Sequence, residues 1–151
     1  MKNLFKTLVK TNPNLGFSIS RLTLGFVLFP HGAQKLLGLF GGYGYSGTME
    51  SLTNQMDLPS IVAFSVIMIE FFGSISLVIG LFSRFWALSF VGMFLGIIFT
   101  TQLEHGFFMN WFGNQTGEGY EYSLLVIGLA LTILVNGSGK WSIDTIILKK
   151  Q

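Results

Sequence analysis

Apolar residues gather in four long stretches of the chain, and segments rich in glycine and polar residues separate them. The stretches cover about residues 15–39, 60–81, 85–103 and 121–136. A helix needs roughly 20 apolar residues to cross a hydrocarbon core of about 30 Å, and the last stretch is at the short end of that range. The pattern predicts an all-α fold, a four-helix bundle formed by one domain over residues 1–151.

The composition favours an integral membrane protein. Half of the residues are hydrophobic and only 11% are charged, and the mean hydropathy is +0.61. These values are too apolar for an ordinary soluble domain, so the lipid bilayer is the expected surrounding. The formal charge of +2 comes without a basic cluster, which argues against a nucleic-acid partner. Cysteine is absent, so the chain forms no disulfide and performs no thiol chemistry.

The distribution of basic residues predicts the orientation of the helices. With four spans, both termini lie on the same side of the membrane. The short connection between the second and third stretches lies on that side too. That side carries seven basic residues, whereas the two long loops carry Lys35 alone. The seven are Lys2, Lys6, Lys10, Arg84, Lys140, Lys149 and Lys150. Basic residues concentrate on the cytoplasmic side of membrane proteins, which predicts cytoplasmic termini and a multi-pass protein of the cell (inner) membrane.

Two charged residues lie away from the ends of the apolar stretches, Arg21 in the first and Glu70 near the middle of the second. A charged side chain in hydrocarbon costs roughly 2.5–3.5 kcal/mol on insertion scales, so both are expected to face protein or water. We expect them to pair, with the long arginine side chain bridging the difference in depth. Such a pair is either a fixed contact between helices, a proton relay or the polar end of a ligand pocket. Both are therefore candidate catalytic residues.

The first stretch has one distinctive face. At about 100° per residue, Arg21, Gly25, Gly32 and Lys35 fall within one narrow stripe. Glycines on such a stripe let a neighbouring helix approach closely. We expect this face to look into the bundle.

Six polar residues are expected at the outer ends of the helices, where they could line a vestibule above an aromatic pocket. They are His31, Gln34, Lys35, Glu104, His105 and Glu121. A quinone needs a hydrogen-bond donor at each carbonyl and a proton source when it is reduced, and His, Lys and Glu side chains supply both. These six are candidate cofactor-binding residues, and His31 is also a candidate catalytic residue. The alternative is that they meet lipid headgroups and water.

The two histidines do not form a recognisable metal site. Neither the HxxxK spacing at His31 nor the EH pair at His105 matches a zinc or di-iron motif, so no metal site is predicted. Haem held between these two histidines is an alternative that a spectrum would test.

Several blocks of the sequence resemble the DoxX family, DoxX- and DoxD-like small four-helix membrane proteins. The blocks follow one another over nearly the whole chain: RLTLGFVLFPHGAQKL, IEFFGSISLVIGLFSR, HGFF, GEGYEYSLLVIGLALTIL and GSGKWSID. The resemblance implies a role in quinone-linked electron transfer, in sulfur or oxidative-stress chemistry, as a subunit of a membrane oxidoreductase system.

Three classes of function stay open at this point. The chain could be a quinone-linked redox component that works with a membrane or soluble redox partner. It could instead be a non-catalytic scaffold for such a partner, or a transporter of a small solute. The absence of an internal repeat or of paired broken helices argues against transport. The sequence leaves homo-oligomerisation open.

Overall fold

The computed structural model describes the backbone of residues 2–149 and the side chains of residues 6–149, and all regular structure in this part is helical. The side chain of Lys2 and all of Lys150, which the charge count used, lie outside the described residues. The helices are α1 (Lys2–Val9), α2 (Leu15–Leu37), η1 (Leu39–Gly41), α3 (Gly44–Glu50), η2 (Ser51–Gln55), α4 (Ser60–Met68), η3 (Ile69–Gly73), α5 (Ser74–Ile79), α6 (Ser83–Ile97), η4 (Ile98–Gln102), η5 (Leu103–His105), α7 (Glu121–Asn136) and α8 (Ile143–Lys149).

Four long helical segments begin and end within two residues of the four apolar stretches. They are α2, the continuous run α4–η3–α5, the run α6–η4–η5, and α7. Two of them, Ser60–Ile79 and Ser83–His105, are apolar and long enough to cross a membrane, with mean hydropathies of 2.2 and 1.6. Helix α7 is shorter than these two, and α2 carries the charges discussed below.

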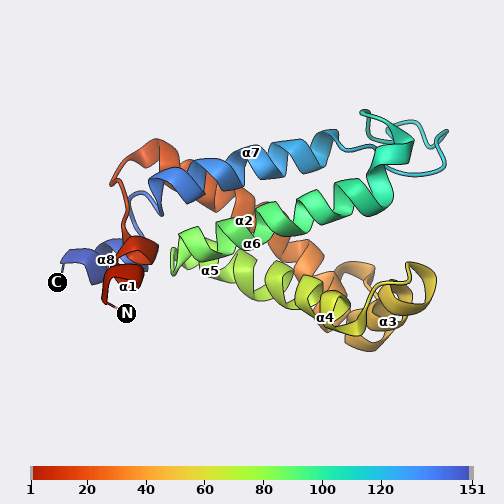
Figure 1. Cartoon of the computed structure of the whole chain (residues 1–151), viewed down its shortest axis with the longest axis horizontal. Coiled ribbons are helices and arrows are strands. Elements are labelled where there is room, and N and C mark those ends of the chain that lie inside the picture. The colour runs from red at the N-terminus through yellow and green to blue at the C-terminus, as the bar shows by residue number, and fades with distance from the viewer. Residues whose placement is uncertain (1, 150–151) are drawn as a thin grey trace.

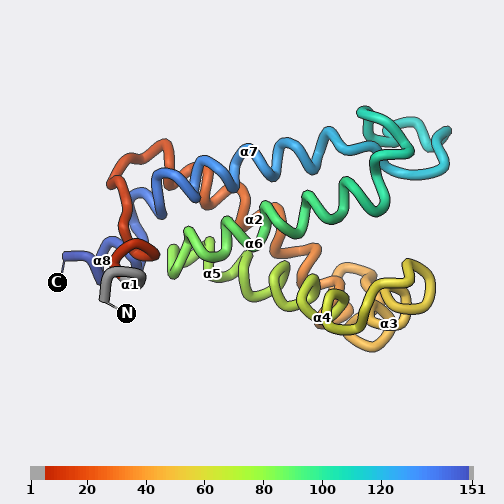
Figure 2. Tube along the Cα trace, in the orientation of Figure 1, coloured from red at the N-terminus to blue at the C-terminus, as the bar shows by residue number. Residues whose placement is uncertain are grey.

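The four segments lie side by side along the long axis of the molecule (Figures 1 and 2). Helix α2 packs against α5 and α7, and α6 packs against the same two helices, so the contacts form a closed ring. Helices α1 and α8 contact each other at the end that holds both termini. Helix α3 and the loop of residues 106–120 lie at the opposite end, which we call the loop end (Figure 1).

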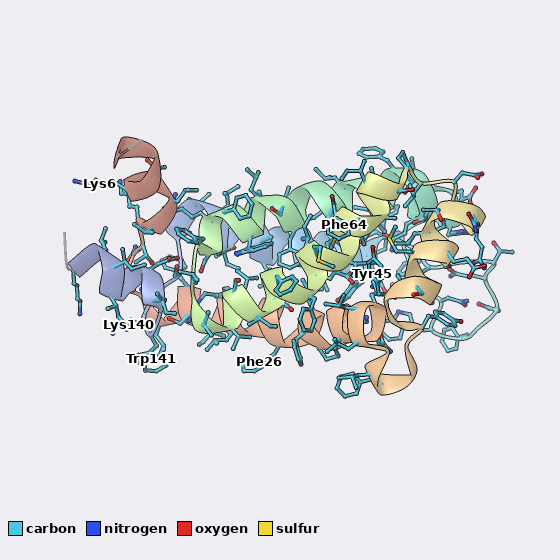
Figure 3. All side chains as sticks on the ribbon, turned by 90° about the horizontal axis from the view of Figure 1, so that it is seen from below. Lys6, Phe26, Tyr45, Phe64, Lys140 and Trp141 are labelled. Atoms are coloured by element: carbon cyan, nitrogen blue, oxygen red, sulfur yellow. The ribbon has the colours of Figure 1, made fainter. Side chains whose placement is uncertain are left out.

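Apolar residues fill the core and also cover the outside. The core takes side chains from every long segment, including Leu28, Leu77, Phe90 and Ile133. Phe26 points away from the helices near the middle of the molecule, and 62% of it is exposed (Figure 3). Other large apolar residues are exposed along the same lengths: Ile19, Ile61, Leu88, Phe99, Leu125 and Val135. Such a surface suits hydrocarbon rather than water.

The glycines of the predicted stripe do allow close helix contact. A Cβ atom on Gly32 would lie 2.6 Å from the backbone of Phe71, and one on Gly25 would lie 3.0 Å from the carbonyl oxygen of Ser74. Both neighbours belong to the second long segment, at η3 and α5. The stripe therefore fixes the distance between α2 and the helix that carries Glu70.

Replacing Gly32 with alanine is expected to lower the free energy of unfolding by about 1–3 kcal/mol, because the added methyl group meets backbone that cannot move aside. The matched control is Gly92→Ala, since a Cβ atom at Gly92 meets nothing within 4 Å. That change should be neutral or slightly stabilising, because alanine favours a helix. Thermal unfolding followed by circular dichroism in detergent compares them, and equal melting temperatures would contradict the close contact.

Candidate functional site

Arg21 is fully buried on α2, and its guanidinium donates hydrogen bonds to backbone carbonyls. The acceptors lie at the end of α5 and just before α8: Leu77, Val78, Ser138, Lys140 and Trp141. The distance is 2.8 Å from Nε to the Ser138 oxygen and 3.1 Å from Nη2 to the Trp141 oxygen. Arg21 thus ties α2 to two other segments at the end that holds the termini.

The predicted pair between Arg21 and Glu70 is wrong. Glu70 instead pairs with Lys35, which follows Arg21 on α2 by fourteen residues, or about 21 Å of helix. Arg21 is level with Leu77 and Val78, beyond the reach of Glu70. The charge of Arg21 is accommodated by carbonyl oxygens that no side-chain pattern reveals.

A buried carboxylate, Asp144, closes the same end of the molecule. It accepts hydrogen bonds from the backbone N–H groups of Phe82 (2.8 Å) and Ser83 (3.1 Å), where α6 begins. The hydroxyl of Ser138 also donates to it. Asp144 therefore satisfies the free N–H groups of a helix start, and its negative charge favours that position. Together with Arg21 it forms a junction between helices at the end that holds the termini.

Glu70 and Lys35 form an ion pair between the middle of the second long segment and the part of α2 next to the loop end. The Lys35 Nζ lies 2.5 Å from Glu70 Oε2, and only 4% of Glu70 is exposed. Glu70 Oε2 is buried, and the Lys35 ammonium group is its partner. Glu70 lies in the π-helical turn η3, and such turns are frequent at functional sites.

Tyr122 joins this pair from the other side of the core. Its hydroxyl is also buried and lacks a hydrogen-bond partner within the described part of the chain. The ring of His31 lies 6.5 Å from the ring of Tyr122, and Glu70 is close enough to Tyr122 for the two groups to interact electrostatically. We call Lys35, Glu70, Tyr122 and His31 the Glu70 cluster. It can hold a proton on its carboxylate and donate one from its phenol.

Two cavities adjoin the Glu70 cluster. The aromatic cavity has a volume of about 470 Å³ and is lined by Phe107, Met109, Trp111, Glu121, Tyr122, Leu124 and Leu125. The polar cavity has a volume of about 300 Å³, and its lining includes Gln34, Lys35, Tyr43 and Ser51. Tyr122 thus belongs to the wall of one cavity and Lys35 to the wall of the other. Both volumes are in the range typical of small-molecule sites.

The remaining candidate residues divide between these features. Glu121 lines the aromatic cavity, and Gln34 lines the polar cavity and donates to the carbonyl of Phe40. His105 lies 3.5 Å from Glu104, but that glutamate is largely exposed, and the pair takes no part in the Glu70 cluster. No group of three or more potential metal ligands occurs among the described residues.

Sequence reasoning missed Tyr122 and Asp144. A signal for Tyr122 was present, because it precedes Val126, Ala130 and Ile133 at spacings that place all four on one side of α7. Those three residues are buried in the core. Asp144 left no such signal, since its partners are backbone N–H groups 61 and 62 residues away.

Comparison with known proteins identifies the family. The sequence model of the DoxX family matches residues 16–103, more than half of the chain. The chain belongs to the DoxX family. DoxX proteins are membrane proteins, in agreement with the apolar helices and apolar outer surface described above. The part that matches DoxX contains Arg21, His31, Gln34, Lys35 and Glu70, whereas Glu121 and Tyr122 follow it.

This DoxX chain is also similar to a curated relative from Bacillus subtilis (strain 168), named "Putative oxidoreductase CatD". The two are 26% identical over 135 residues, and the similarity covers 89% of each chain. It therefore extends over the loop end and α7 as well as the part matched by the DoxX model. No solved structure matches the chain.

Proposed function

We propose that this DoxX-family protein is a quinone-associated redox component of the cell (inner) membrane. The observation that carries the proposal is the Glu70 cluster, in which the buried hydroxyl of Tyr122 has no hydrogen-bond partner among the described residues while Tyr122 lines a cavity with aromatic walls. Buried polar groups are nearly always hydrogen-bonded, and exceptions often mark a site that a ligand or water completes. The name of the Bacillus relative as an oxidoreductase supports the same class of reaction.

The proposed topology is a four-helix membrane bundle with both termini in the cytoplasm. At 1.5 Å per residue the 23 residues of α2 measure about 35 Å and the 16 of α7 about 24 Å. Two of the basic residues used in the charge count, Lys6 and Lys140, lie at the end that holds the termini (Figure 3). This arrangement turns the loop end, with the Glu70 cluster, toward the outside.

The residues of the Glu70 cluster suit a quinone. When bound, a quinone supplies the capacity to take up two electrons and two protons. The aromatic cavity would hold its ring, and the hydroxyl of Tyr122 is a hydrogen-bond donor at the inner wall. Glu70 can release or take up a proton, and Lys35 stabilises its charged form. The electrons would come from a separate membrane or soluble redox partner, since the described residues contain no group that stores them.

The first experiment is an oxidised-minus-reduced difference spectrum of the protein purified gently in detergent, followed by reconstitution in nanodiscs containing quinone. A quinone band that co-purifies with the protein is the expected result. Haem bands would instead make His31 and His105 ligands and overturn the proposal. A flat spectrum in detergent and in nanodiscs would also overturn it, in favour of a scaffold or transport role.

A further inference from the structure

The aromatic cavity is closed on one side by the loop of residues 106–120, and the carboxylate of Glu121 fastens the part of that loop that lines the cavity. Glu121 Oε1 accepts hydrogen bonds from the backbone N–H of Met109 (3.1 Å) and from Trp111 Nε1 (2.8 Å). Both donors belong to residues that line the cavity. Trp111 therefore forms a lid over the cavity that Glu121 holds in place.

The second oxygen of this carboxylate is available. Glu121 Oε2 makes no hydrogen bond or ion pair with any residue that the structure describes, and Glu121 itself belongs to the cavity wall. The two N–H donors of the lid are already committed to Oε1. An ionised carboxylate accepts hydrogen bonds but cannot donate them. Glu121 Oε2 therefore offers a ligand in the cavity a hydrogen-bond acceptor.

The cavity opens toward the outer surface of α7. Leu125 is 69% exposed and Leu124 is 45% exposed, and both belong to the lining. In a bilayer these side chains meet lipid, so the mouth faces the hydrocarbon rather than the water outside. A ligand that dissolves in the membrane can enter sideways between α7 and the lid.

We propose that the aromatic cavity selects the reduced, hydroquinone form of a membrane quinone, an inference that rests on the proposed function. A hydroquinone carries O–H donors, and one of them would donate to Glu121 Oε2. An oxidised quinone carries only carbonyl oxygens, which accept hydrogen bonds as the carboxylate does. The two groups therefore could not form a hydrogen bond and would repel each other. Phe107, Trp111 and Tyr122 supply flat side chains for the ring. Glu121 is therefore a specificity-determining residue.

The test uses Trp111 as a reporter. The chain has three tryptophans, so Trp86→Phe and Trp141→Phe leave Trp111 alone. This protein, in nanodiscs, is titrated with a short-chain benzoquinone in oxidised and reduced forms, and each Kd is taken from the saturation of the Trp111 fluorescence change. We expect the reduced form to bind about tenfold more tightly or better, since a hydrogen bond to a charged group is at stake.

The variants separate recognition from loop anchoring. Glu121→Gln should bring the two Kd values within about twofold, and Glu121→Asp should retain part of the preference. The matched control is Glu118→Gln, because Glu118 holds the same loop through the backbone N–H of Asn110 (2.8 Å) but is not part of the cavity wall. This control should keep the preference.

Each other outcome overturns a defined statement. Equal affinity for the two forms, or an equal loss of preference in Glu118→Gln, would refute the role of Glu121. A quinone band that co-purifies without any response of Trp111 would refute this site while leaving the proposed function standing. If neither form binds and no band co-purifies, both proposals fail.

Discussion

Replacing Arg21 with methionine is expected to prevent the protein from accumulating in its folded form. Removing one partner of a buried charged network typically costs about 3–5 kcal/mol, which approaches the whole stability of many proteins. Here the change removes the guanidinium from five carbonyl oxygens, of which those of Leu77 and Lys140 keep a second donor. Fluorescence-detected size-exclusion chromatography and circular dichroism in mild detergent measure the loss.

Two further variants make the Arg21 result specific. Arg21→Lys keeps the charge but offers three donors on a single nitrogen. One nitrogen cannot reach both α5 and the segment before α8, so the stability of this variant should lie between those of the wild type and Arg21→Met. Arg84→Met is the matched control, because Arg84 also donates to backbone carbonyls, those of Lys10 and Val135, but is only partly buried. Its effect should be small. An Arg21→Met protein that melts with the wild type would disprove the role of the guanidinium as a junction.

Replacing Glu70 with glutamine is expected to lower the free energy of unfolding by about 2–4 kcal/mol and to abolish retention of quinone. The change leaves the ammonium group of Lys35 beside a neutral amide in a largely buried place. Removing both charges, in Lys35→Met with Glu70→Gln, should recover much of the stability, because no charge then stays unpaired. The double variant should still lack quinone.

A double-mutant cycle in detergent measures this coupling, with quinone content determined on the same samples. The control is Glu104→Gln, which breaks the exposed contact with His105 and should leave the melting temperature unchanged. If the effects of the two single changes simply add, the ion pair contributes nothing to stability. If the Glu70→Gln protein retains quinone at the wild-type level, the Glu70 cluster is not the site.

The sequence predicted the helices well because each carries a long apolar run, and it predicted the inward face of α2 because helical spacing aligns Arg21 with two glycines. It failed on the partners of the charges. Arg21 is held by backbone carbonyls, which every residue has, so no residue type marks them. The sequence predicted a pair between Glu70 and Arg21. In the structure, the way α2 packs along α4–η3–α5 places Lys35 next to Glu70 instead.

The candidate site was predicted only in part. Lys35, His31 and Glu121 do lie at or beside the Glu70 cluster and the aromatic cavity, because all four long segments bring their outer ends together at the loop end. Tyr122 was overlooked because a tyrosine near the end of a span resembles an interfacial anchor. Its importance comes from a buried hydroxyl that finds no hydrogen-bond partner in the described part of the chain, a property that only the three-dimensional structure reveals.

The junction around Arg21 and Asp144 also sets the order of events during biosynthesis. Arg21 is inserted early, yet its acceptor at Ser138 lies 117 residues later in the chain. The start of α6 likewise waits for Asp144. Until the ribosome has made residues 138–144, the guanidinium has only the carbonyls of Leu77 and Val78 as acceptors, and the first N–H groups of α6 lack the carboxylate that caps them. The end that holds the termini therefore completes its hydrogen bonds only after the segment that carries Ser138 and Asp144 is made.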